Sequence, residues 1–247
     1  MRTKAPRGLP RLCRASARGA GLALCLWLAG AVAGAAQQIE AARYAEPTTR
    51  YAHGVLGDAV EWGALEIKVA GEGWRRAVLP QRLVFEDIAP RLADLDGDGA
   101  PEVIVVESDR SQGARLAVWG ADGRITATPH IGQSNRWLAP IGAADMDGDG
   151  KVEIAYVDRP HLAKTLRVWR YDAGRLTEVA SAAGFSNHRI GWDYIEGGLR
   201  DCGQGPEMVL ASGNWRQVMA VRFDGQLASR ALGAYSATAV ADALACR

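Results

Sequence analysis

The 247-residue chain lacks the short motifs that mark common catalytic sites. It has no Gly-x-Ser-x-Gly elbow and no phosphate-binding loop. Its four histidines are scattered, and none has the His-x-x-x-His spacing of a metal site. No window outside the N-terminal segment has a helical period. These absences argue against the commonest hydrolases and nucleotide-binding enzymes, and against a helical fold.

Long apolar runs are also scarce, and the one near the N-terminus is too short to span a membrane. Residues 1–18 carry six basic residues and no acidic one, and an apolar run follows over 19–33. A membrane-spanning helix needs about 20 apolar residues, whereas a basic start, a short apolar run and small residues at 33–36 are typical of a secretory signal peptide. We therefore expect cleavage after residue 36. The domain over 37–247 would then be periplasmic or secreted and have no membrane span; an uncleaved anchor is the alternative.

The mature chain has no excess of positive charge. Residues 37–247 contain 23 basic and 28 acidic residues. Because nucleic-acid-binding proteins usually carry a basic balance, we expect no nucleic-acid partner.

Cysteine is scarce, and only Cys202 and Cys246 lie beyond the predicted signal peptide. An even pair in an oxidising compartment favours a disulfide, with two buried thiols as the alternative. The bridge would close a loop of about 45 residues and stabilise the fold by about 4 kcal/mol in the chain-entropy estimate.

Turn signals recur at a fixed distance along the mature chain. Their centres lie near residues 71, 122, 173 and 224, a step of about 51. Short β-branched runs flank each turn, as at 116–119 and 166–169. The pattern predicts an all-β protein built from about four repeats of about 51 residues, each a four-stranded antiparallel blade. Since one such sheet cannot bury both of its faces alone, the expected architecture is a β-propeller.

Two repeats contain the same dense group of carboxylates. Alternate residues of a tight loop point inward, so acids at positions one, three, five and nine and a carbonyl at position seven would surround Ca²⁺. An EF-hand would need Glu at position twelve, but Val105 and Tyr156 stand there. An ordinary polar turn is the alternative, but it needs only one Asp and one Gly. We expect two structural Ca²⁺ sites, with these ligands: Asp94, Asp96, Asp98, Ala100 and Glu102; Asp145, Asp147, Asp149, Lys151 and Glu153.

The pattern Asp-x-Asp-Gly-Asp-Gly-x-x-Glu, leading directly into an apolar strand, resembles the FG-GAP and VCBS-type repeats of secreted β-propellers. The resemblance covers residues 84–172, where Ile-Gly-Ala-Ala at 141–144 replaces the Phe-Gly segment of the family. It implies Ca²⁺ in the loop between the first two strands of a blade. The copy at 200–207 keeps Pro-Glu without the Asp ladder, so we expect no metal there. The propellers of this family often have seven blades, whereas four units are visible here.

The loops at the opposite ends of the strands are rich in arginine and histidine. Ser-Asn-Arg at 134–136 and Ser-Asn-His-Arg at 186–189 occupy equivalent repeat positions. We hypothesise that this face binds an unknown protein or an anionic or sugar-like ligand. The proposed contacts are Arg136, Trp137, His188 and Arg189. In the alternative interpretation, arginines pair with Asp109, Asp158 or Asp193 and only link neighbouring blades.

Catalysis has weaker support than binding. A lone histidine at a strand end is more often a hydrogen-bonded structural residue than a catalyst. We therefore expect a non-enzymatic interaction module. The alternative is a propeller-type hydrolase or lyase acting on a sugar or phosphoester with His188, Asp193 and Arg189.

Overall fold

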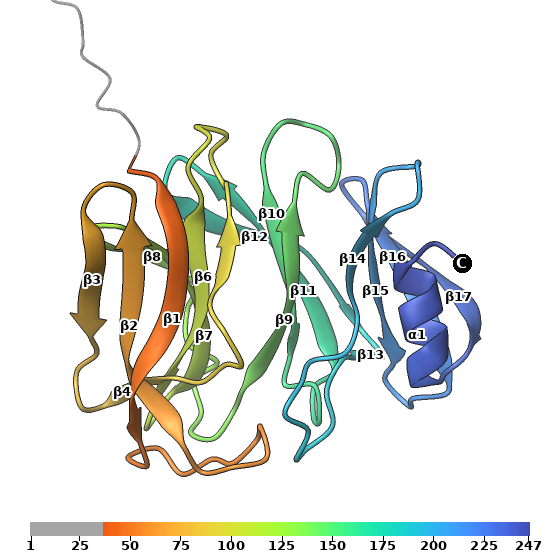
Figure 1. Cartoon of the computed structure of the whole chain (residues 1–247). Coiled ribbons are helices and arrows are strands. Elements are labelled where there is room, and N and C mark those ends of the chain that lie inside the picture. The colour runs from red at the N-terminus through yellow and green to blue at the C-terminus, as the bar shows by residue number, and fades with distance from the viewer. Residues whose placement is uncertain (1–36) are drawn as a thin grey trace, which may run out of the picture. The chain divides into compact units, whose positions relative to one another are not determined.

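The computed structural model describes residues 37–247 (Figure 1). The predicted signal peptide, residues 1–36, lies outside the described residues. The all-β prediction is confirmed, since this part consists of antiparallel strands in three sheets and one short helix. No helix between residues 37 and 247 is long and apolar enough to cross a membrane.

The three sheets follow one another in chain order. The first contains β1 (Ile39–Thr48), β2 (Glu61–Val69), β3 (Gly73–Val78), β4 (Leu83–Phe85), β5 (Arg91–Ala93), β6 (Glu102–Asp109), β7 (Gly113–Gly120) and β8 (Gly123–Ala127). The second contains β9 (Leu138–Ala144), β10 (Glu153–Asp158), β11 (Thr165–Asp172) and β12 (Arg175–Ala183). The third contains β13 (Phe185–Ser186), β14 (Gly198–Asp201), β15 (Pro206–Ser212), β16 (Gln217–Phe223) and β17 (Leu227–Ala234).

The prediction of four separate blades is wrong. The short strand β4 pairs with both β2 and β6, through Trp62 opposite Phe85 and Val84 opposite Ser108. This link merges the first two repeats into one eight-stranded sheet. The first and third sheets lie at opposite ends of the described part in Figure 1, and no strand pairing there closes a ring.

The periodic hairpins of the sequence are confirmed. The turns between β2 and β3, β7 and β8, β11 and β12, and β16 and β17 lie at the four predicted positions. The runs at 116–119 and 166–169 lie in β7 and β11. In each of the last two repeats and in the β5–β8 part of the first sheet, four consecutive antiparallel strands surround such a hairpin. The local four-stranded unit was therefore correctly predicted for three of the four repeats.

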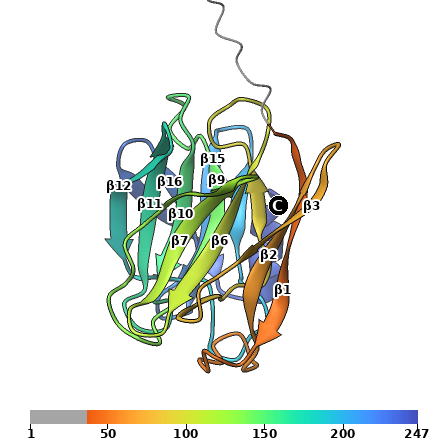
Figure 2. The same cartoon turned by 90° about the vertical axis from the view of Figure 1, so that its left-hand side faces the viewer.

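Central strands bury both of their faces. In β6, Val103 and Val105 pack with Ile67 of β2, whereas Ile104 and Val106 belong to a separate core shared with the second sheet. In strand β10, one face likewise belongs to the core shared with the first sheet, and the other face belongs to a core shared with the third sheet. Burial of one such aliphatic side chain stabilises the fold by roughly 1.5–3 kcal/mol. Contacts between successive sheets therefore bury one face of β6 and both faces of β10, whereas the other face of β6 packs on strands of its own sheet (Figure 2).

The chain ends in a helix that the sequence pattern did not reveal. Helix α1 (Ala237–Leu244) begins after Ser236, whose side chain accepts the N–H of Ala239 at 3.0 Å. Val240 and Ala243 pack against β15 and β16. Eight residues are too few to establish a helical period, and the available signal was the N-cap serine before an alanine-rich run.

The predicted disulfide is present and fastens this C-terminal helix. Cys246 follows α1 and is bonded to Cys202 in the loop between β14 and β15, with the two Cα atoms 5.6 Å apart. The bridge thus joins the end of the chain to the third sheet.

Candidate functional site

The first acidic loop joins β5 to β6 and is closed by hydrogen bonds within itself. Asp94 accepts the N–H of Gly97 on Oδ1 at 2.8 Å and that of Gly99 on Oδ2 at 3.0 Å. Both glycines have left-handed φ values, 76° and 89°, which a residue without a Cβ adopts freely. The Asp-Gly-Asp-Gly spacing therefore bends the loop around the Asp94 carboxylate.

Three carboxylates of this loop converge. Asp94, Asp96 and Glu102 each place an oxygen within 4.8 Å of the others. Glu102 begins β6 and accepts the N–H of Leu95 at 2.9 Å. Burial raises the pKa of Glu102, and the charges of Asp96 and Asp98 raise it further. The cluster could hold a metal ion, and donors that are all carboxylate oxygens fit a hard cation.

The second acidic loop, between β9 and β10, has the same construction. Asp145 accepts the N–H groups of Gly148 and Gly150 at 2.8 and 3.0 Å. Asp145, Asp147 and Glu153 form a second triplet of converging carboxylates that could hold a metal ion. The repetition extends to individual hydrogen bonds, so the two loops share one geometry.

The two clusters differ in one neighbouring side chain. Arg170 of β11 donates to Glu153 at 2.6 Å and to Asp147 at 2.5 Å, and it lies 3.0 Å from an oxygen of Asp149. Trp169 precedes it in β11, and the matching tryptophan of β7 is followed by Gly120. The first cluster therefore has no arginine at this position, and the second has a cation built into the fold.

Four predicted ligands lie outside the converging triplets. The carboxylates of Asp98 and Asp149 accept the backbone N–H of Ala100 and Lys151 at 2.8 and 2.9 Å. The Lys151 ammonium is 2.6 Å from Asp172, the last residue of β11 before the β11–β12 turn. This ion pair places the second acidic loop beside an Asp-Gly turn, as expected. The coordinating roles of these residues remain a prediction.

In the third repeat, arginines surround the acid that follows the loop. Glu207 accepts from Arg200 at 2.8 Å and from Arg230 at 2.9 Å. These guanidinium groups hold the pKa of Glu207 below its ordinary value despite its burial. The two arginines already neutralise the carboxylate charge of Glu207, which a metal ion would otherwise do.

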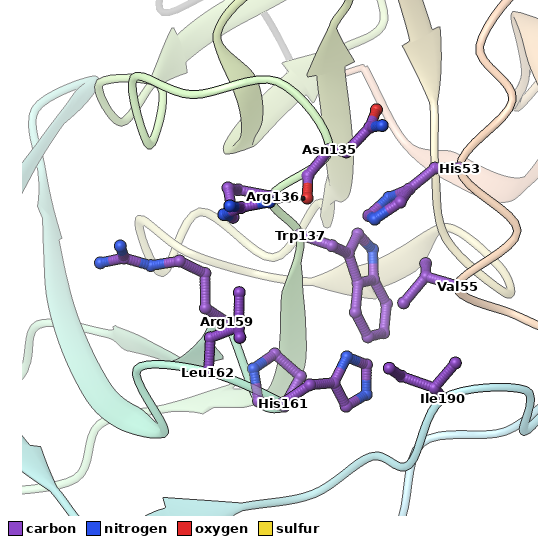
Figure 3. Close-up of a pocket in the computed structure, with 10 residues that line it drawn as sticks. His53, Val55, Asn135, Arg136, Trp137, Arg159, His161, Leu162 and Ile190 are labelled. Atoms are coloured by element: carbon purple, nitrogen blue, oxygen red, sulfur yellow. Dashed lines mark hydrogen bonds between the residues drawn. The ribbon is translucent and has the colours of Figure 1, made fainter.

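A pocket of about 310 Å³ opens among the arginine- and histidine-rich loops. Its walls come from the loop after β1, the segment before β9 and the β10–β11 loop (Figure 3). Two predicted contact residues, Arg136 and Trp137, are among its lining residues: His53, Val55, Asn135, Arg136, Trp137, Arg159, Pro160, His161, Leu162 and Ile190.

Sequence reasoning missed the histidine and carboxylate pair at this pocket. His53 Nδ1 lies 2.6 Å from Oε1 of Glu86, which is fully buried and is also bonded to the hydroxyl of Ser108. Burial raises the pKa of Glu86. Glu86 follows β4, whose pairing with β2 and β6 was not predicted, and so the sequence carried no signal for this contact.

His188 does not face the pocket directly. It is fully buried, and its Nδ1 lies 2.9 Å from Nε2 of His161. Its Nε2 lies 3.0 Å from the carbonyl oxygen of Trp192, which only accepts hydrogen bonds. Both ring nitrogens of His188 are thus engaged. Burial and the neighbouring His188 lower the pKa of His161 to about 4.

Trp137 and Arg189 are held by different surroundings. Trp137 is 2% exposed, and its indole N–H donates to the Glu86 carbonyl at 2.8 Å. The Arg189 guanidinium lies over the rings of Trp215, Trp192 and Tyr235, at 4.4, 5.5 and 5.6 Å from their centroids. Of the four predicted contacts, the structure therefore brings two to the pocket, places His188 behind it, and stacks Arg189 on a neighbouring aromatic group.

A family model described as an FG-GAP-like repeat matches residues 94–156, which run from the first acidic loop through the second to strand β10. A search of curated proteins found no match. The matched segment contains both clusters of converging carboxylates. The chain is an FG-GAP repeat-containing protein.

Proposed function

We propose that the protein is a secreted, calcium-stabilised interaction module, with one structural Ca²⁺ in each acidic loop. The observation that carries this proposal is the pair of loops in which three carboxylates converge within 4.8 Å. Such oxygen clusters suit Ca²⁺, and extracellular modules of this kind bind it at roughly 10⁻⁴–10⁻³ M. The position of both loops in an FG-GAP-like repeat supports the same assignment.

A structural role for the metal fits the position of the loops. Each loop connects two neighbouring antiparallel strands, β5 to β6 and β9 to β10. A cation shared by acids at both ends of such a loop would hold the two strands together. The pocket is lined by other loops, and so the metal is not needed to contact a ligand.

The binding role is assigned to the face that carries the pocket. Asp158 pairs with Arg159 and Arg167 at 2.8 and 3.0 Å, but all three residues belong to the β10–β11 hairpin, and so these pairs link no neighbouring sheets. Within residues 37–247, Arg136 and Arg189 make no ion pair with a carboxylate. Arg136 donates only to carbonyl oxygens, which supports binding of an anionic group over a purely structural role, whereas Arg189 is stacked on aromatic rings.

Calcium titration of chelator-treated protein tests the metal assignment. We expect calorimetry to show two sites, of which Asp96→Asn removes one and Asp147→Asn the other, because each change withdraws a converging carboxylate. Asp224→Asn, in the exposed β16–β17 turn, is the matched control and should retain both sites. Absence of binding at millimolar calcium would show that the two loops are solvated turns.

A further inference from the structure

We propose that the pocket between the loops at residues 53–55, 134–137 and 159–162 binds a carboxylate joined to an apolar group. This inference rests on the proposed binding role of the same face and names the chemistry of its ligand. Three features of the pocket carry it: its apolar wall, the sign of its charges and the free nitrogen of His53.

The apolar wall is unusually exposed. Ile190 and Leu162 are 72% and 63% exposed, the highest values among the large hydrophobic residues of the described chain, and both line this pocket. In Figure 3, Val55 and the ring of Trp137 lie between His53 and Ile190, and Leu162 lies next to Arg159. Exposed apolar side chains gathered at one cavity mark a binding site rather than ordinary surface. An apolar part of a ligand would shield them from water.

The polar side of the pocket is cationic. Arg136 and Arg159 line it, and no carboxylate does. The nearest acids lie behind: Glu86 is bonded to His53, and Asp158 holds Arg159 through two bonds of 2.8 and 3.0 Å. Arg136 donates only to carbonyl oxygens of its own loop, including that of Asn135 at 2.9 Å. Guanidinium groups with free donors match the planar, two-oxygen carboxylate.

His53 completes the anion site. Its Nδ1 is engaged by Glu86, whereas its Nε2 makes no hydrogen bond to the described residues. Nε2 is therefore the ring nitrogen left for a ligand, and it carries hydrogen in the doubly protonated ring and in one neutral tautomer. Nε2–H can then donate to the ligand carboxylate. The arrangement orients the ring in the same way as a carboxylate orients a histidine that binds metal.

The backbone of the pocket is also held in an uncommon conformation. Asn135 and Arg159 have φ values of 53° and 48°. Such left-handed conformations of residues other than glycine cluster at ligand sites, where the surrounding structure maintains them. Both residues line the pocket, so two of these uncommon conformations lie at this one site.

Binding of small probes to the purified protein tests this inference. We expect hexanoate to bind measurably by calorimetry and by NMR shifts, because it supplies both the carboxylate and the apolar chain. Hexanamide lacks the charge and acetate lacks the apolar group, so each should bind at least about tenfold more weakly. The tripeptide Gly-Gly-Leu, with a free or an amidated C-terminus, distinguishes a chain terminus from a free acid as the source of the carboxylate.

Two lining residues supply the variants, the half-buried Arg136 and the exposed Leu162. Arg136→Gln should weaken the binding of hexanoate at least about tenfold, and Leu162→Ser should weaken it several-fold without abolishing the preference for acid over amide. Arg216→Gln is the matched control, since this exposed arginine does not line the pocket. Unchanged melting curves would show that each variant is folded; a variant that melts early is replaced by Arg136→Lys or Leu162→Ala.

Each outcome bears on the pocket separately from the calcium sites. Tighter binding of the free-acid peptide than of hexanoate would support the chemistry and identify a chain terminus as its source. Equal binding of hexanoate and hexanamide, or no binding of any probe by folded protein, would overturn the inference. Calcium titration of the same samples keeps the two proposals apart, because two calcium sites without probe binding would refute only the pocket.

Discussion

At the scale of single residues, Arg170 makes two otherwise equal loops different. Its guanidinium contacts Asp147, Asp149 and Glu153, whereas the equivalent position beside the first loop is Gly120. A metal that enters the second cluster must displace this side chain or share the carboxylates with it. Charge-assisted hydrogen bonds of this kind contribute about 1.5–3 kcal/mol each when their surroundings are partly buried.

Replacing Arg170 by Ala should therefore strengthen calcium binding at the second loop by about tenfold, since one competing contact of about 1.4 kcal/mol is enough for that change. The same change should destabilise the calcium-free protein, because the acids lose their only cation. Calorimetric titration measures the first effect and urea unfolding with a chelator measures the second.

Arg167→Ala is the control for this experiment, because Arg167 lies on the same strand but pairs with Asp158 and Glu178. It should leave both calcium affinities unchanged. An Arg170→Ala protein with the parent affinity at its second site would show that the guanidinium does not compete with the metal.

At the scale of elements, one glycine determines how closely two sheets approach. Gly142 lies in β9, opposite β14 of the third sheet. A Cβ placed on Gly142 would lie 2.8 Å from Cδ1 of Leu199, closer than packed carbon atoms allow. The glycine of the Ile-Gly-Ala-Ala segment therefore serves sheet packing.

Gly142→Ala should lower the free energy of unfolding by about 1–3 kcal/mol, the range observed when an extra carbon is forced into a packed contact. Urea unfolding measures the change. In a double-mutant cycle, the penalty should be smaller when Leu199 is already Ala, because the clashing atom is gone.

Gly120→Ala tests whether any strand glycine would behave in the same way. Its added Cβ would meet only the flexible end of Ile125, at 3.2 Å. We expect a smaller loss of stability than for Gly142→Ala. Equal losses in the two variants would refute the role assigned to the contact between β9 and β14.

At the scale of the whole molecule, the buried Glu61 and the half-buried His161 give stability an opposite dependence on pH. Burial raises the pKa of Glu61 from 4.5 to about 9, and the charges of Glu86 and Asp58 add to the shift. The unfolded chain releases this proton near pH 4.5 while the folded chain retains it, so stability falls as pH rises toward 9. His161, with its pKa lowered to about 4, resists protonation when folded, and so stability also falls between about pH 6.5 and pH 4.

Glu61→Gln should flatten the alkaline side of this curve. The parent protein should lose on the order of 5 kcal/mol of unfolding free energy between pH 5 and pH 9 through this one group. The amide keeps the shape of the side chain and does not titrate. Urea unfolding at a series of pH values measures both curves.

The exposed Asp224 provides the comparison, and Asp224→Asn should reproduce the parent curve. His161→Asn should instead reduce the loss on the acid side. If Glu61→Gln followed the parent curve up to pH 9, another group would control the alkaline loss.

The acidic loops and the disulfide show how much local sequence can predict. The hydrogen bonds of the first loop form between Asp94 and the nearby Gly97 and Gly99, so the local spacing of these residues is enough to predict the loop. By contrast, β4 has three residues and α1 has eight, too few to produce a period. The merging of the first two repeats and the C-terminal helix were therefore missed.

The sequence by itself determined the strands, their hairpins and the carboxylate loops, because each depends on residues that are close together in the chain. It also determined the repeat step, because the turn signals themselves recur along the chain. Only the tertiary structure decided that the repeats form three sheets and that Arg170 lies against the second loop. It also decided that His53 meets Glu86, 33 residues away, and that their pair faces a pocket beside Trp137 and His161. Such contacts depend on how sheets stack and where β4 pairs, and no local pattern encodes that arrangement.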